Sequence, residues 1–130
     1  MAKNYNSKQY VRFDFRIKDN TKKYSKAFQT AAERAILQGL EDVLFVSKQL
    51  VPYDTGALQK TGRIEKKGNT YSVVYGSPSV RYAYPQHEIP YFHDNGREWK
   101  YVETPFNEMQ SGLDRRIANE INYEIKRSIR

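Results

Sequence analysis

The sequence contains no cysteine and only two histidines among its 130 residues. The lack of cysteine excludes disulfide bonds, thiol nucleophiles and cysteine-bound zinc, and it suits a reducing compartment. Two histidines are too few for a multi-histidine metal centre and leave little for Ser-His-Asp chemistry. Neither a Gly-x-Gly-x-x-Gly loop nor a phosphate loop with Gly-Lys-Ser/Thr occurs, so nucleotide hydrolysis has no support.

Long hydrophobic runs are also missing. The longest strictly apolar run covers residues 43–46, far short of the ~20 residues that a membrane-spanning helix needs. Residues 1–8 lack the apolar segment of a signal peptide. We therefore expect a protein that is made in the cytosol and has no membrane partner.

Positive charge is plentiful and unevenly placed. Lys plus Arg number 22 against 15 Asp plus Glu, a formal net charge of +7. Most of this excess lies within residues 1–26, which makes one basic edge on a nearly neutral body. Such an edge fits nucleic acid, a membrane or an acidic protein surface, and charge alone does not choose among them. The candidate contacts are Arg12, Arg16, Lys18, Lys22 and Lys23.

The first half of the chain predicts one strand and one long helix. Apolar and charged side chains alternate over residues 10–17, which is the period of a half-buried strand. Over residues 24–51 the apolar side chains recur with the period of an amphipathic helix, and Pro52 ends it. Gly39 lies within this helix at a cost of ~1 kcal/mol relative to alanine, so we expect close packing there.

The second half predicts short strands followed by a helix. Gly68-Asn69 is a hairpin turn pair, and residues 86–98 read as a loop. Thr104 and Pro105 fit the N-cap and the first residue of a terminal helix. The sheet and its loops are expected over residues 60–103 and the helix over 104–129, with candidate strands at 63–67, 71–75, 80–84 and 99–102.

This order of elements predicts an α+β fold. We expect an antiparallel sheet of about four strands, with the long central helix and the C-terminal helix packed on one face. A chain of this length supports one core, so residues 1–130 are interpreted as a single domain whose residues 1–20 form a basic N-terminal strand region.

Asp54-Thr55-Gly56-Ala57 matches the tetrapeptide that carries the catalytic aspartate of aspartic proteases. Those enzymes bring two such carboxylates together to share one proton and activate water, so a chain with one copy would have to dimerise. The same tetrapeptide makes an ordinary turn, in which the aspartate caps backbone N–H groups and the glycine takes a positive φ. We favour the turn and keep the protease as an alternative.

Two His-acid pairs, His87-Glu88 and His93-Asp94, raise the alternative of a metal-dependent hydrolase. The zinc-protease helix needs a second histidine four residues after the first, and that position is Tyr91. We therefore expect no catalytic residue, no metal and no cofactor. A small nucleic-acid-binding protein is a further alternative, because aromatic residues interleave with the basic ones near the N-terminus.

Three short motifs follow the long helix in a fixed order, and a Pro-Phe pair begins the last helix. They consist of Asp54, Thr55, Gly56 and Leu58; then Tyr82, Ala83, His87 and Glu88; then Gly96, Tyr101 and Glu103. This ordered set resembles the tail-component and minor-capsid proteins encoded in the head–tail joining cluster of long-tailed bacteriophages and prophages. The resemblance covers about residues 25–125. Within the family, the form of the second and third motifs is similar to that of the branch from phages of Gram-positive hosts.

The resemblance implies a virion structural protein of the phage neck. Such a subunit oligomerises as a ring, expected to be a hexamer, and takes part in tail completion or head–tail joining without catalysis. The implied partners are further copies of the chain, head connector or stopper proteins, tail terminator or tail tube proteins, and packaged DNA by non-specific contact. The three motifs are expected to form subunit contacts. The location is the virion neck, with the host cytoplasm during assembly, and a minor capsid protein elsewhere on the head is the alternative.

Overall fold

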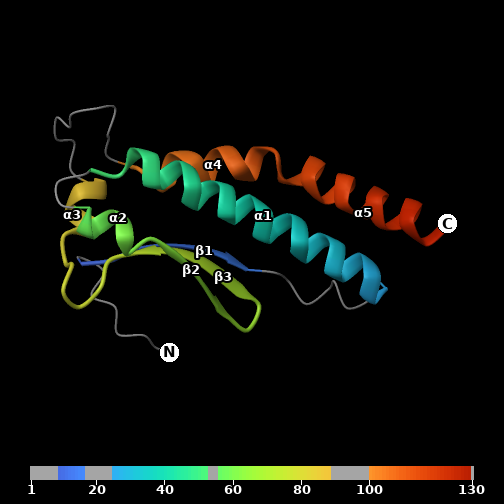
Figure 1. Cartoon of the computed structure of the whole chain (residues 1–130), viewed down its shortest axis with the longest axis horizontal. Helices are drawn as coiled ribbons and strands as arrows, with labels where there is room; N and C mark the ends of the chain where they lie inside the picture. The colour runs from blue at the N-terminus through green and yellow to red at the C-terminus, as the bar shows by residue number, and fades with distance from the viewer. Residues whose placement is uncertain (1–8, 17–24, 53–55, 89–99, 130) are drawn as a thin grey trace.

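The structure is a computed structural model that describes residues 9–16, 25–52, 56–88 and 100–129 (Figure 1). Within these ranges the chain is α+β, as predicted. Its elements are β1 (Val11–Arg16), α1 (Lys26–Leu50), α2 (Ala57–Lys60), β2 (Arg63–Lys67), β3 (Thr70–Tyr75), α3 (Ala83–Glu88), α4 (Glu103–Ser111) and α5 (Leu113–Ile129).

The described residues form one three-stranded antiparallel sheet in the order β1-β3-β2, rather than a sheet of about four strands. Strand β1 pairs with β3 from Val11 opposite Tyr75 to Arg16 opposite Thr70. Strands β2 and β3 form the predicted hairpin, and Gly68 in its turn has the positive φ of 60° that a tight hairpin turn requires.

Two expected strands are wrong. Within residues 80–84, Val80 makes only an isolated bridge to Ser77, and Ala83 already belongs to α3. Ala83 and His87 are both buried, so the segment follows a helical four-residue spacing that its alternating apolar side chains had disguised. Residues 86–88 are correspondingly helical instead of loop.

The expected strand over residues 99–102 is contradicted at residues 100–102, where the chain bends and turns. Lys100 has a φ of 58°, which is incompatible with a strand. Trp99 lies outside the described residues.

The long helix α1 falls within the predicted 24–51 range. Ser25 caps it, because its side chain accepts a hydrogen bond from the backbone N–H of Phe28. Gly39 is closely packed, as expected from its place in the sequence: a Cβ there would lie 2.9 Å from Cγ of Met109 on α4. The glycine therefore allows α4 to approach α1.

The C-terminal helix is two helices instead of one. Gly112 separates α4 from α5, with a φ of −107° and a ψ of 5°. Helix α4 begins at Glu103 with Val102 as its N-cap, two residues earlier than the predicted cap at Thr104. Pro105 is consequently in the first turn, where its missing N–H has no intrahelical partner to lose.

One face of the sheet meets α1. Tyr71, on β3, donates a hydrogen bond to Glu33 of α1 at 2.9 Å, and Tyr75 at the other end of the same strand bonds to Ser47 of α1 at 2.6 Å. Phe13 of β1 contacts Phe106 of α4, with ring centroids 5.3 Å apart. One hydrophobic cluster thus collects residues from strands and helices alike.

Helix α5 runs antiparallel to α1 along most of its length (Figure 1). Arg34 of α1 donates to Glu120 of α5 at 2.8 Å and lies 3.6 Å from Glu124, and Asp42 pairs with Arg116. No helix in the described part of the chain combines the length and apolar character needed to cross a bilayer.

Candidate functional site

Residues of the second and third sequence motifs meet in one cluster between α3 and the start of α4. We call His87, Glu88, Lys100, Tyr101 and Glu103 the His87 clasp. His87 and Tyr101 are fully buried, with 0% exposure, whereas the side chains of Glu88 and Glu103 are 32% and 41% exposed. The clasp therefore has a buried aromatic side and a charged rim.

Hydrogen bonds fix the protonation of the imidazole. His87 Nε2 accepts from the backbone N–H of Glu103 at 3.3 Å, so the ring proton lies on Nδ1, which donates to Glu88 Oε2 at 2.8 Å. The other oxygen of Glu88 accepts from Lys100 Nζ at 2.7 Å, and Lys100 also lies 3.2 Å from Glu103. The four polar side chains thus form one connected chain of contacts.

Lys100 occupies a strained backbone position. Its φ of 58° is in the left-handed region, which is uncommon for a residue with a Cβ. The backbone N–H of Lys100 donates to the carbonyl of His87 at 2.8 Å, while its ammonium holds Glu88 and Glu103. These contacts hold Lys100 in this conformation and join the end of α3 to the start of α4.

The electrostatics of the clasp favour a neutral imidazole beside a carboxylate. Burial lowers the pKa of His87 below its usual 6.5 and outweighs the contact with Glu88, which raises it. For Glu88, burial raises the pKa, but hydrogen bonds from Lys100 and His87 outweigh it and lower the pKa below its usual value. The hydrogen bond to Glu88 raises the pKa of Lys100.

Aromatic rings extend the clasp into the core. Tyr101 contacts the rings of His87 and Tyr75 edge-on, with centroids 4.8 and 5.1 Å away, and donates its hydroxyl to the carbonyl of Ala83 at 2.8 Å. Tyr75 donates to Ser47, whose own hydroxyl proton goes to the carbonyl of Leu44. Burial raises the pKa of Tyr75 to about 12 and also raises that of Tyr101, so both hydroxyls stay protonated.

This arrangement supplies structure more readily than chemistry. Both ring nitrogens of His87 are engaged, and the imidazole has no exposed surface through which a substrate could reach it. Among the residues that the structure describes, no group of three His, Cys, Asp or Glu side chains could hold a metal ion. His93 and Asp94, the other half of the metal hypothesis, lie outside the described residues.

The Asp-Thr-Gly motif is described only in part, because Asp54 and Thr55 lie outside the described residues. Gly56 has a φ of 84°, which agrees with the turn interpretation, and α2 follows it immediately. Leu58 is 2% exposed and belongs to the core. The end of this motif thus anchors a short helix between α1 and β2.

The two residues of the Tyr-Ala pair in the second motif differ in exposure. Ala83 is fully buried, while Tyr82 is 42% exposed and nearby Tyr84 is 38% exposed. His87 and Tyr101 are buried, so their side chains belong to this subunit's own core. Tyr82 and the two glutamates reach the surface. Gly96 lies outside the described residues.

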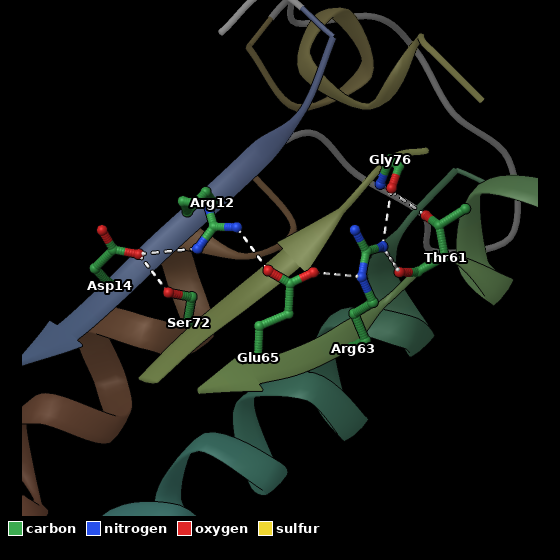
Figure 2. Close-up of polar contacts among 7 residues, drawn as sticks. All are labelled: Arg12, Asp14, Thr61, Arg63, Glu65, Ser72 and Gly76. Carbon is green, nitrogen blue, oxygen red and sulfur yellow. Dashed lines mark hydrogen bonds and ion pairs between the residues drawn. The ribbon is translucent and has the colours of Figure 1, made fainter. Parts of the chain in front are cut away.

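The outer face of the sheet carries a network of charged side chains (Figure 2). Arg12 lies 2.7 Å from Glu65 and 3.7 Å from Asp14, so this candidate DNA contact already has two carboxylate neighbours. Arg63 donates to the other oxygen of Glu65 at 2.9 Å, which links β1 to β2 across the central strand. Arg16 is exposed. Lys18, Lys22 and Lys23 lie outside the described residues.

The arginine stems also cover the central strand. Val74 projects from the middle of this outer face, yet it is fully buried between its register partners Arg12 and Arg63. Arg63 further donates to the carbonyls of Thr61 and Gly76 at 2.7 and 2.9 Å, which fixes the end of β3 (Figure 2). Phosphate binding by Arg12 would therefore require breaking contacts that hold the sheet.

Three structural residues escaped the sequence analysis as site residues. Ser47 interrupts the apolar stripe of α1, and a hydroxyl at such a position signals a buried polar partner, which is Tyr75. Lys100 gave no signal, because its positive φ depends on contacts from two helices. Glu65 alternates with apolar Ile64, but its pairing with Arg12 depends on which strand lies between them.

Comparison of the chain with models of known protein families, with curated proteins and with solved structures finds no match in any of the three.

Proposed function

We propose that this protein is a virion structural protein of a bacteriophage neck, a tail-completion or head–tail joining subunit that acts without catalysis. In this proposal it oligomerises as a ring between the head connector and the tail tube. Its partners are further copies of itself, head connector or stopper proteins, and tail terminator or tail tube proteins. It resides in the host cytoplasm until assembly and then in the virion neck.

The observation that carries the proposal is the use of the motif residues as a scaffold. His87 and Tyr101 come from two separate motifs of the phage family pattern, and both are fully buried where they meet in the His87 clasp. A catalytic histidine needs access to substrate and a protonation state that can change, whereas this one is buried and engaged at both nitrogens. The pattern therefore favours a protein that works through its surface.

The surface near the clasp supplies contact groups. Tyr82, just before α3, and Tyr84, in its first turn, expose aromatic rings, and tyrosine is enriched in protein–protein interfaces. The outer face of the sheet carries paired charges, which suit a polar interface rim better than a DNA-binding surface. Any contact with packaged DNA would then fall to Arg16 and the lysines that follow it.

The test is electron microscopy of particles made by a phage or prophage from which the gene is deleted. We expect full heads lying beside separate tails of finished length. Joined particles with unstable or misshapen heads would favour a minor capsid protein, and normal infectious particles would refute the proposal. Expression of the wild-type gene in trans must restore joining.

A variant in the same complementation assay separates structure from catalysis. Asp54→Asn removes the carboxylate that an aspartic protease would need but keeps the size and hydrogen-bonding capacity of the side chain. We expect Asp54→Asn to restore joining as the wild type does. A folded Asp54→Asn protein that fails to restore it, together with loss of a measured peptide cleavage, would instead support the protease.

A further inference from the structure

The C-terminal end of α5 exposes an apolar stripe. Leucine or isoleucine recurs at every fourth position of α5, from Leu113 to Ile129. Exposure rises along this series from 8% at Leu113 to 40% at Ile125 and 76% at Ile129. We call Tyr123, Ile125, Lys126, Arg127 and Ile129 the α5 tail.

The stripe becomes exposed because the C-terminal end of α5 extends beyond the first turn of α1. Figure 1 shows the C-terminal end of α5 at one end of the long axis, beyond the first turn of α1. Ile129 is three-quarters exposed at the end of a series that begins buried at Leu113, so no residue that the structure describes covers this apolar side chain. Lys126 and Arg127 are exposed beside it, and Arg127 lies 3.9 Å from Glu124, so its surroundings carry a net positive charge.

A groove lies between α1 and α4, toward the other end of the molecule. Its volume is about 340 Å³, and its lining mixes apolar side chains with a charged rim. Phe45 is 67% exposed and Val46 is 39% exposed. We call it the α1/α4 groove, lined by Asp42, Val43, Phe45, Val46, Pro105, Glu108, Met109 and Arg116.

The rim of the groove is acidic. Its lining includes two acidic side chains, Asp42 and Glu108, and one basic side chain, Arg116, which pairs with Asp42. Glu41, next to Asp42 in α1, is exposed as well. The groove therefore offers an apolar floor with a negative rim, and the α5 tail offers apolar side chains beside two positive charges. The two surfaces are complementary in both respects.

One copy of the chain cannot join its own two surfaces. Arg116 at the groove and Ile129 in the tail belong to the same helix, so a rigid rise of about 20 Å separates them. Two tails are also poorly suited to each other, because Lys126 and Arg127 of one would face the same charges of the other. The fitting occupant of the groove is the tail of a second copy.

We infer that the α5 tail of one subunit docks in the α1/α4 groove of the next. The contact joins two different surfaces, so its repetition produces a closed ring or an open filament. This inference deepens the ring of the proposed function and names its interface. It depends on that proposal only for the place of the ring in the virion.

Sedimentation velocity of the full chain, from micromolar to millimolar concentration, tests the inference. Wild type should form oligomers larger than a dimer. Phe45→Glu in the groove and Ile129→Glu in the tail should each weaken association by about tenfold or more, because each places a carboxylate against apolar side chains. Ala118→Glu, an equal charge change at an exposed position of α5, should assemble as wild type does.

Mixing the two defective variants gives the sharpest result. Phe45→Glu keeps an intact α5 tail, and Ile129→Glu keeps an intact α1/α4 groove. Together they should form a one-to-one dimer, which cannot grow because its two remaining surfaces are the altered ones. Circular dichroism melts check that both are folded. A monomeric wild type, undiminished assembly of either folded variant, or a mixture that stays monomeric would each overturn the inference.

The two proposals fail separately. Separate heads and tails in the deletion phage, together with a wild-type protein that assembles equally well as Phe45→Glu, would refute the interface alone. Normal particles in the deletion phage, together with the expected one-to-one dimer, would refute the neck function and retain the interface.

Discussion

Replacing Gly62 with alanine should destabilise the fold by forcing apart two buried groups. Gly62 lies between α2 and β2, and a Cβ there would be 2.6 Å from Cζ, 2.7 Å from Cε2 and 2.9 Å from the hydroxyl oxygen of Tyr75. Carbon atoms in contact normally sit ~3.5–4.0 Å apart, so the ring must retreat by about 1 Å. The φ of Gly62 is not in the left-handed region, so the clash alone opposes alanine.

The surroundings of Tyr75 leave it little room to retreat. The ring is fully buried, Tyr101 contacts it edge-on at 5.1 Å, and its hydroxyl is held by Ser47 at 2.6 Å. Overpacking typically costs about 1–3 kcal/mol, and a weakened buried hydrogen bond about 1 kcal/mol. Alanine regains about 0.4–1 kcal/mol by restricting the unfolded chain. The net expectation is a loss of about 2 kcal/mol in the free energy of unfolding.

Urea denaturation followed by circular dichroism measures this loss, with Gly112→Ala as the matched control. No atom lies within 4 Å of the Cβ that alanine would add at Gly112, where φ is −107°. Gly112→Ala should therefore raise the free energy of unfolding by about 0.4–1 kcal/mol, because it restricts the unfolded chain without a clash in the folded one. Equal stability of Gly62→Ala and Gly112→Ala would refute the packing argument.

Three further predictions concern the clasp and the start of α1. Burial lowers the pKa of His87 below 6.5, so the unfolded chain binds a proton that the folded chain does not. The stability that goes with neutral His87 is thus complete above about pH 6.5 and decreases as the pH falls, by up to ~1.4 kcal/mol per pH unit. The variant His87→Gln should lack this slope. Equal slopes for the wild type and the variant, in denaturation at several pH values, would contradict the prediction. Tyr101→Phe removes the donor to the buried carbonyl of Ala83 and should cost about 1–2 kcal/mol in the same assay, whereas an unchanged midpoint would show that the hydrogen bond adds nothing. Ser25→Ala removes the cap of α1 and should cost ~1 kcal/mol, measured by thermal melting, with an unaltered melting temperature as the contrary result.

Elements with strong periodicity could be predicted from the sequence. The alternation over residues 10–17 predicted β1, the long apolar stripe and Pro52 predicted α1, and Gly68-Asn69 predicted the hairpin. The close approach at Gly39 was also foreseen, because a glycine within a helix is unfavourable unless something packs against it. These are local signals, each contained within one strand, one turn or one helix.

The failures occur where packing overrides a short pattern. Residues 80–84 alternate like a strand, but the chain becomes helical from Ala83 onward, where Ala83 and His87 are buried on one side of α3. The terminal helix was predicted as continuous, and Gly112 divides it. At α3 the local alternation is outweighed by the surface that the helix buries, whereas at Gly112 the low helix propensity of glycine is the local signal that was overlooked.

The sequence by itself determined the fold class, the long helix, the hairpin and the basic character of the N-terminal strand. Only the tertiary structure decided what the charged and polar residues do. Arg12 faces Glu65 because β3 lies between their strands, and His87 reaches Glu103 where the backbone N–H of Lys100 bonds to the carbonyl of His87. From the composition alone, these charged and polar side chains look like free charges or candidate ligands, because the partners that they meet in the fold lie far away in the sequence. Their neighbours, and hence their pKa values and roles, exist only once the core has brought the elements together.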